Sequence, residues 1–172
     1  HSLAERIWST PAKAPGDAVA QLVAVRVLNS SYEVTDTVDI REPVYLQMEY
    51  ENKQEHLRPT AIFHVINEEG VCLFATNDFN NREWASTPRS PSRVKATCRI
   101  PNNFLAEGRL FVLAAIGTYN PNVVHALERD VVSFQVVDRG EGDSVRGEYT
   151  GGQWPGVVRP WLDWTIEISR II

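Results

Sequence analysis

Short runs in which apolar and polar residues alternate dominate this sequence and restrict what it can fold into. A period of two is typical of a β-strand that buries one face, and no long stretch keeps the 3.6-residue period of a helix. The runs are Gln21–Leu28, Thr37–Ile40, Val44–Tyr50, Ala61–Ile66, Val71–Thr76, Arg93–Ile100, Arg109–Gly117, Val131–Val137 and Trp164–Ile168. Short strands without crossover helices predict an all-β fold: an antiparallel β-sandwich, with an up-and-down barrel as the alternative.

The alternation also predicts which side chains point between the sheets, because residues two apart share one face of a strand. The expected core faces of two strands are Val44, Leu46, Met48 and Tyr50, and Leu110, Val112, Ala114 and Ile116. Tyr45, Gln47 and Glu49 then form an exposed polar row on the opposite face.

The length of 172 residues corresponds to one domain. Pro11, Pro15 and Gly16 interrupt residues 1–19, for which we expect a linker, and residues 20–172 are expected to form the domain. Cys72 and Cys98 lie in strand-like runs, so we expect free, buried thiols, which suit the reducing cytoplasm. No signal peptide is visible, and no apolar stretch is long enough to cross a bilayer.

The charge balance and the motifs exclude several functions. The 17 Lys and Arg against 22 Asp and Glu give a net charge of -5, and the basic residues are scattered, which disfavours nucleic-acid binding. No glycine-rich phosphate loop is present, so no nucleotide or other cofactor is expected. The four histidines lack metal-ligand spacing, the paired acids lie in turn-like segments, and no nucleophile motif occurs. We therefore expect no catalytic residue, no metal site and no enzyme activity.

Two loops, residues 77–91 and 119–125, are longer than turns require and are candidates for binding. Sugars stack on aromatic rings and satisfy their hydroxyls with amide, carboxylate and guanidinium groups. The candidate carbohydrate-binding residues are Asn80, Asn81, Arg82, Trp84, Tyr119, Asn120 and His125 in these loops, with Tyr45 and Gln47 on the exposed face. The alternative is a hydrophilic loop whose Trp84 merely packs on the sandwich edge.

Three motifs resemble one known family. They are Arg41-Glu42-Pro43-Val44-Tyr45, Glu69-Gly70-Val71-Cys72-Leu73-Phe74-Ala75-Thr76-Asn77, and Ile100-Pro101-Asn102-Asn103-Phe104-Leu105 with Gly108. Their order and spacing resemble the C-terminal domain of the nucleotide-binding subunit of polysaccharide ABC exporters of the Wzt type. That family has Leu-Leu where this chain has Phe104-Leu105, and the 77–91 loop is longer than the resemblance leads us to expect.

The resemblance implies a β-sandwich of immunoglobulin-like or jelly-roll-like type that binds an exported bacterial polysaccharide such as an O-antigen, without catalysis. It further implies an ATPase domain before His1, a membrane subunit of the transporter as partner, and a place at the cytoplasmic face of the inner membrane. A ligand-free dimerisation or adhesion module is the alternative, and a glycan-cleaving enzyme is a third class.

The last residues are too apolar for a free end. Trp161, Trp164, Ile166, Ile168 and Ile171-Ile172 are therefore expected to form a strand that pairs with a sheet edge. That edge belongs to the same chain or to a partner, and the resemblance favours the partner, as a homodimer formed by strand exchange.

Overall fold

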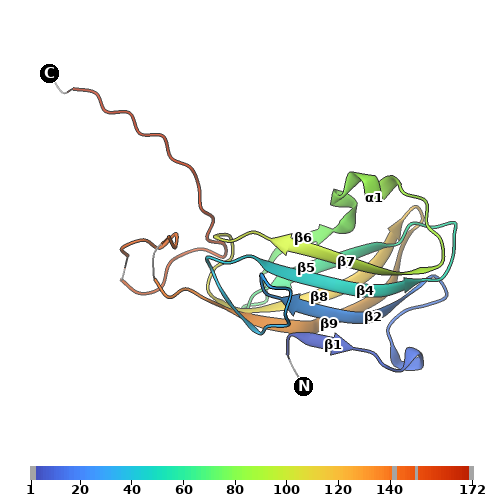
Figure 1. Ribbon diagram of the computed structural model, residues 1–172. Helices are drawn as coiled ribbons and strands as arrows, with labels where there is room; N and C mark the ends of the chain where they lie inside the picture. Colours follow the sequence, from blue (N-terminus) through green and yellow to red (C-terminus); the bar gives the residue numbers. More distant parts are fainter. Residues whose placement is uncertain (1–2, 141–142, 150, 171–172) are drawn as a thin grey trace.

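The strands of the computed structural model form two sheets packed face to face (Figure 1), and the structure describes residues 3–140, 143–149 and 151–170. The four-stranded sheet has the order β1 (Glu5–Ile7), β2 (Ala20–Leu28), β4 (Val44–Asn52), β7 (Ser92–Ile100). The five-stranded sheet has the order β3 (Thr37–Asp39), β9 (Asn122–Val137), β8 (Gly108–Tyr119), β5 (Thr60–Ile66), β6 (Cys72–Asn77). These pairs are antiparallel except β3 with β9. The expected β-sandwich is confirmed.

The core faces expected from the alternation are also confirmed. Leu46, Met48 and Tyr50 of β4 are fully buried, and Ile116 of β8 is buried with them between the sheets. Gln47 lies on the outer face of β4 and is only half-buried. The register is decided by this burial, because a one-residue slip would turn every apolar side chain toward water.

The described helices are short, and asparagine caps two of them. They are η1 (Pro11–Lys13), η2 (Asp78–Asn80) and α1 (Arg82–Ser86). Asn77 and Asn81 precede η2 and α1, and each accepts a backbone N–H with its side-chain oxygen, as an N-cap does. No helix in the described ranges is long and apolar enough to span a membrane.

Two segments differ from the sequence-based expectations. Glu5–Ile7, inside the segment expected to be a linker, pairs with β2 as an edge strand. The expected loop 119–125 is mostly strand, because β8 runs to Tyr119 and β9 begins at Asn122, leaving a two-residue turn. A tight turn of this kind holds its flanking residues in the sheet, so far less of this segment is available as a binding loop.

The two cysteines are free, but the expectation that both are buried is wrong. Cys72 is exposed, because it begins β6, the outermost strand of its sheet. Cys98 lies on β7, the outermost strand of the other sheet, and is only half-buried. Burial raises the pKa of the Cys98 thiol.

The C-terminal region contains a packed segment followed by an extended tail. The Arg159 guanidinium is buried and forms an ion pair with Asp138 at 2.7 Å, and the Arg159 backbone N–H donates to Phe104. Beyond it the chain runs away from the sandwich (Figure 1), with Trp164 84% exposed and Ile168 92% exposed. Of the two alternatives for residues 164–168, pairing with an edge of the same chain is not seen in the described ranges, and pairing with a partner stays a prediction. Ile171 and Ile172 lie outside the described residues.

Candidate functional site

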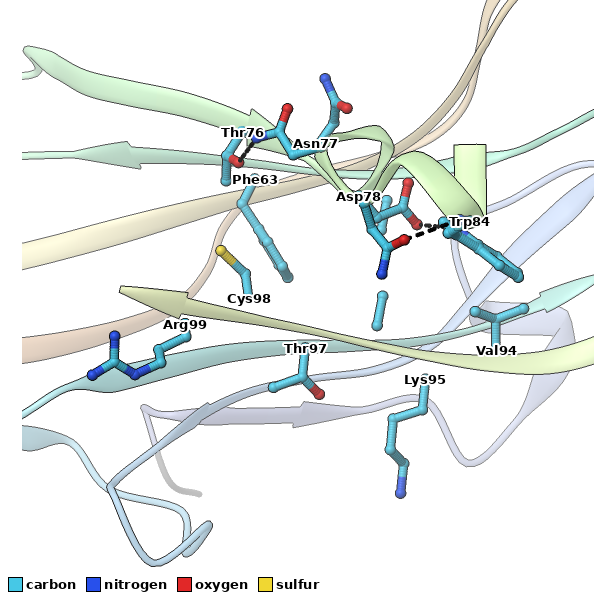
Figure 2. Close-up of a pocket in the computed structure, with 14 residues that line it drawn as sticks. Phe63, Thr76, Asn77, Asp78, Trp84, Val94, Lys95, Thr97, Cys98 and Arg99 are labelled. Carbon is cyan, nitrogen blue, oxygen red and sulfur yellow. Dashed lines mark hydrogen bonds between the residues drawn. The ribbon is translucent and has the colours of Figure 1, made fainter. Parts of the chain in front are cut away.

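A cavity of about 520 Å³ opens where the two sheets part at one side of the sandwich. Its walls come from β5, β6 and β7 and from the segment that carries η2 and α1 (Figure 2). β6 and β7 are outermost strands of opposite sheets, so nothing pairs with their free edges in the described chain. We refer to this cavity as the β6–β7 pocket.

The floor of the pocket is apolar. It consists of Ala61, Phe63, Val94, Ala96 and Cys98. The last three alternate along β7, and Figure 2 shows Val94 and Cys98 on one side of that strand and Lys95 on the other. Phe63 is buried, whereas Val94, Ala96 and Cys98 are half-buried, because the sandwich is open here.

The rim of the pocket carries amide groups from the 77–91 loop. Asn80 donates through Nδ2 to the Thr76 hydroxyl at 3.3 Å, and Asn81 accepts the Trp84 backbone N–H at 3.0 Å. Within the described residues, the Oδ1 of Asn80 and the Nδ2 of Asn81 have no hydrogen-bond partner. One acceptor and one donor are therefore available at the pocket mouth, which is the complement of a ligand hydroxyl.

Trp84 is held in place by its neighbours on two sides. Its indole N–H donates to Asp78 at 2.9 Å, and the other oxygen of the same carboxylate accepts the Thr60 hydroxyl at 2.6 Å. The guanidinium of Arg89 lies over the ring, 3.5 Å from its centre. One face of the indole is thus covered by Arg89, and Trp84 is among the residues that line the pocket.

Arg89 is an unusual support, because it is 94% buried. Its Nη1 donates to the carbonyl of Trp84, but its Nε and Nη2 have no hydrogen-bond partner among the described residues. Burial lowers the pKa of Arg89, and the negative charge of Asp78 partly opposes that shift. The Thr87 carbonyl also accepts from Nη1, so two backbone carbonyls and the Trp84 ring compensate this buried cation.

Three further loop residues expected at the site, Tyr119, Arg82 and Asn120, do not line the pocket, although Tyr119 contacts the lining residue Asn77. The Tyr119 hydroxyl accepts the Asn77 side chain at 3.1 Å, and its ring meets Phe79 edge-on at 5.7 Å. Arg82, in α1, and Asn120, in the β8–β9 turn, are exposed and outside the lining. The 77–91 loop and the β8–β9 turn therefore meet through Asn77 and Tyr119.

Tyr45 and Gln47 lie on the outer face of the four-stranded sheet instead. The Tyr45 ring packs on Tyr32 with centroids 4.7 Å apart. The Gln47 side chain already donates to Thr97 and accepts from Arg26, so both ends of its amide are occupied. β7 separates this outer face from the pocket floor.

His125 is buried and fully hydrogen-bonded within the chain. Its Nδ1 lies 2.7 Å from Asp17 and its Nε2 lies 3.1 Å from the Thr118 hydroxyl. Burial works to raise the pKa of Asp17, but hydrogen bonds from His125 and from two backbone amides hold it below its ordinary value. This histidine fastens the segment before β2 to the β8–β9 hairpin and presents no ring nitrogen to a ligand.

Two residues of the 77–91 loop that are outside the predicted binding set position Trp84. Asp78 lines the pocket and Arg89 does not, and nothing in the linear sequence pairs either of them with Trp84. The alternation of Val94, Ala96 and Cys98 marks a common face, but not that this face borders a cavity. No group of three or more His, Cys, Asp or Glu in the described ranges is placed to hold a metal ion.

The fold and the pocket define the class of protein: a two-sheet β-sandwich domain with an amide-rimmed cavity at its open side. The family model of the Wzt C-terminal domain matches residues 12–151, and this chain belongs to that family. A solved structure described as the crystal structure of the C-terminal domain of wzt superimposes with a TM-score of 0.69 at 12% identity, covering 98% of this chain and 93% of the other. The search of curated proteins finds no match.

Proposed function

We propose that this domain binds a bacterial cell-surface polysaccharide at the β6–β7 pocket and so couples the glycan to export by an ABC transporter. Membership of the Wzt C-terminal domain family supports the setting in polysaccharide export. The observation that carries the binding proposal is the fixed indole of Trp84 beside the amide atoms of Asn80 and Asn81 that have no partner in the described part of the chain. An immobilised ring with hydrogen-bonding groups beside it is what a sugar requires.

In this proposal the chain is the glycan-binding part of a transporter's nucleotide-binding subunit, held at the cytoplasmic face of the inner membrane through the membrane subunit. Two copies associate through the C-terminal tail, whose exposed Trp164, Ile166 and Ile168 alternate as a strand does. Two pockets per dimer strengthen the binding of a repetitive polymer.

The experiment is titration calorimetry with the polysaccharide of the same bacterium. We expect a dissociation constant on the order of micromolar to millimolar, because the contacts are few and solvent-accessible. Trp84→Ala and Tyr119→Ala each remove a ring outside the core, and at least one is expected to lose binding. The melting temperature should hold for Tyr119→Ala and fall for Trp84→Ala, because the Trp84 ring covers the buried guanidinium of Arg89.

Tyr149→Ala is the matched control, since Tyr149 is also an exposed ring but packs on Trp154 away from the pocket. Tyr45→Ala tests the outer face of the four-stranded sheet. Unchanged binding by both Trp84→Ala and Tyr119→Ala, or loss only with Tyr45→Ala, would contradict binding at the pocket. Dimerisation without affinity for any glycan would favour the ligand-free module.

A further inference from the structure

The β6–β7 pocket has an apolar floor beneath a polar rim, and this division restricts what can enter it. Phe63, Ala96 and Cys98 offer hydrocarbon and one half-buried thiol, whereas Asn80 and Asn81 offer hydrogen-bonding atoms at the mouth. Two polar side chains of β7 that border the cavity have partners on the outer face of the strand. Lys95 points to that side (Figure 2) and pairs with Glu49 at 3.1 Å, and the Thr97 hydroxyl accepts from Gln47 at 3.2 Å.

A hydroxyl group placed against this floor would lose hydrogen bonds to water and find no good replacement, which is unfavourable. A methyl group in the same position removes apolar surface from water on both sides of the contact, which is favourable. Ring hydroxyls that remain at the mouth meet the free amide atoms of Asn80 and Asn81. The pocket therefore favours an apolar substituent of the sugar at the floor and hydroxyl groups at the mouth.

We propose that the pocket takes a sugar residue whose inward-pointing substituent ends in a methyl group, as in a 6-deoxyhexose or an N-acetylated sugar. This inference rests on the proposed function and adds the class of sugar to it. The methyl group lies against Ala96, Cys98 and Phe63, and one ring face lies against the indole of Trp84, which lines the same pocket.

Saturation-transfer NMR with matched monosaccharides tests the proposal on the intact chain. The pairs are rhamnose with mannose and fucose with galactose, each in the same enantiomeric series, and N-acetylglucosamine with glucose. The methyl-bearing member of the pair that fits is expected to bind roughly tenfold to a hundredfold more tightly, the range in which an apolar pocket separates a methyl from a hydroxyl. Its methyl protons should receive the strongest saturation. A preference within the rhamnose or fucose pair would identify a 6-deoxyhexose, and a preference within the N-acetylglucosamine pair would identify an N-acetylated sugar.

Ala96→Leu fills the floor and is expected to abolish the preference within the pair. Arg93→Leu is the matched control, because it places the same side chain on the same strand, on the outer face where Arg93 pairs with Glu51. Cys98→Ser is the second variant, should Ala96→Leu fail to fold. It keeps the shape of the side chain and puts a hydroxyl on the floor, so it should reduce the preference.

Equal affinity within all three pairs, or a preference that survives both floor variants, would overturn the proposal. A change of oligomeric state in Ala96→Leu without a change of sugar preference would also overturn it, by assigning the floor to a chain–chain contact. Polysaccharide binding that depends on Trp84 but shows no methyl preference would leave the proposed function standing and remove only this inference. If neither polysaccharide nor monosaccharide binds, both fail.

Discussion

Arg89 and Trp84 are stacked, with the guanidinium carbon 3.5 Å from the centre of the indole ring. The same Arg89 donates to the Trp84 carbonyl, so it holds both the side chain and the backbone of that residue. A ring fixed before a ligand arrives loses less conformational freedom on binding, which improves affinity without any new contact.

Arg89→Met should therefore loosen Trp84. We expect the unfolding free energy to change by less than about 2 kcal/mol, because removal of a desolvated charge offsets the lost cation–π contact and the lost hydrogen bonds to the Trp84 and Thr87 carbonyls. In ¹⁹F NMR of the 5-fluorotryptophan protein, the Trp84 resonance, assigned with Trp84→Phe, should broaden or shift toward the free value. Arg89→Lys should restore the signal only in part, since an ammonium lacks the planar face. An unmoved Trp84 signal in Arg89→Met would show that Asp78 alone positions the ring.

Asn81 has a structural role and a proposed binding role, and two substitutions separate them. Asn81→Ala removes the N-cap of α1 and should cost about 1 kcal/mol of stability. Asn81→Ser keeps a capping oxygen but lacks the free Nδ2, so stability should recover while glycan affinity stays low. Denaturant unfolding and calorimetry measure the two quantities, and recovery of both with serine would exclude a ligand contact by this amide.

The register of β4 predicts a large loss of stability on truncating Met48 and a small one on truncating its neighbour Gln47. Met48→Ala empties a fully buried position and should cost about 2–5 kcal/mol. Gln47→Ala, on the outer face, should change stability by less than about 1 kcal/mol. Urea denaturation of the two variants checks this, and comparable losses would mean that the strand faces are not divided as described.

Asp138 and Arg159 make stability depend on pH at the base of the tail. Burial works to raise the pKa of Asp138, but the Gly140 amide, the Ser144 hydroxyl and Arg159 hold it below the ordinary value of 3.8. Since the folded-state pKa is the lower one, the ionised carboxylate stabilises the fold above about pH 4, and this contribution is lost as the pH falls through the folded-state pKa. Acid unfolding of Asp138→Asn should lack this component.

Breaking the same pair from the other side tests its energetics at neutral pH. Arg159→Met leaves the Asp138 carboxylate buried without its cation and should cost about 3–5 kcal/mol. The double variant Arg159→Met with Asp138→Asn should recover part of this loss. A single variant as stable as the parent chain would show that Ser144 and Gly140 suffice for Asp138.

The tail prediction concerns oligomeric state. A chain that ends at Arg159 keeps the buried ion pair but lacks the exposed apolar residues from Trp161 onward. If the tail holds the proposed dimer, light scattering should show a monomer for this shortened chain and a dimer for the full one. A dimer of unchanged mass after truncation would exclude the tail as the interface.

The sequence by itself determined most of the sandwich strands and their buried faces, because side-chain alternation along a strand is a local property. Leu46, Met48 and Ile116 could be assigned to the core on this basis, and the 77–91 loop could be identified as a candidate from its amides and Trp84. The sequence missed β1 and the start of β9 and predicted a strand at 164–168 that the described chain does not form. The wrong prediction of a loop at Tyr119–His125 also came from local sequence features. Tyr119–His125 contains Pro121 and two Asn and looks like a loop, yet pairing between β8 and β9 continues the strands almost to the turn.

Only the tertiary structure decided which segments meet. The pocket exists because β6 and β7, close in sequence, are outermost strands of different sheets, and strand order depends on non-local pairing. His125 is removed from the candidate site by Asp17, which is 108 residues away in the chain. In the sequence Arg89 resembles any exposed loop cation, whereas in the structure it is buried against Trp84. Burial and contacts depend on the fold of the whole chain rather than on the neighbouring residues.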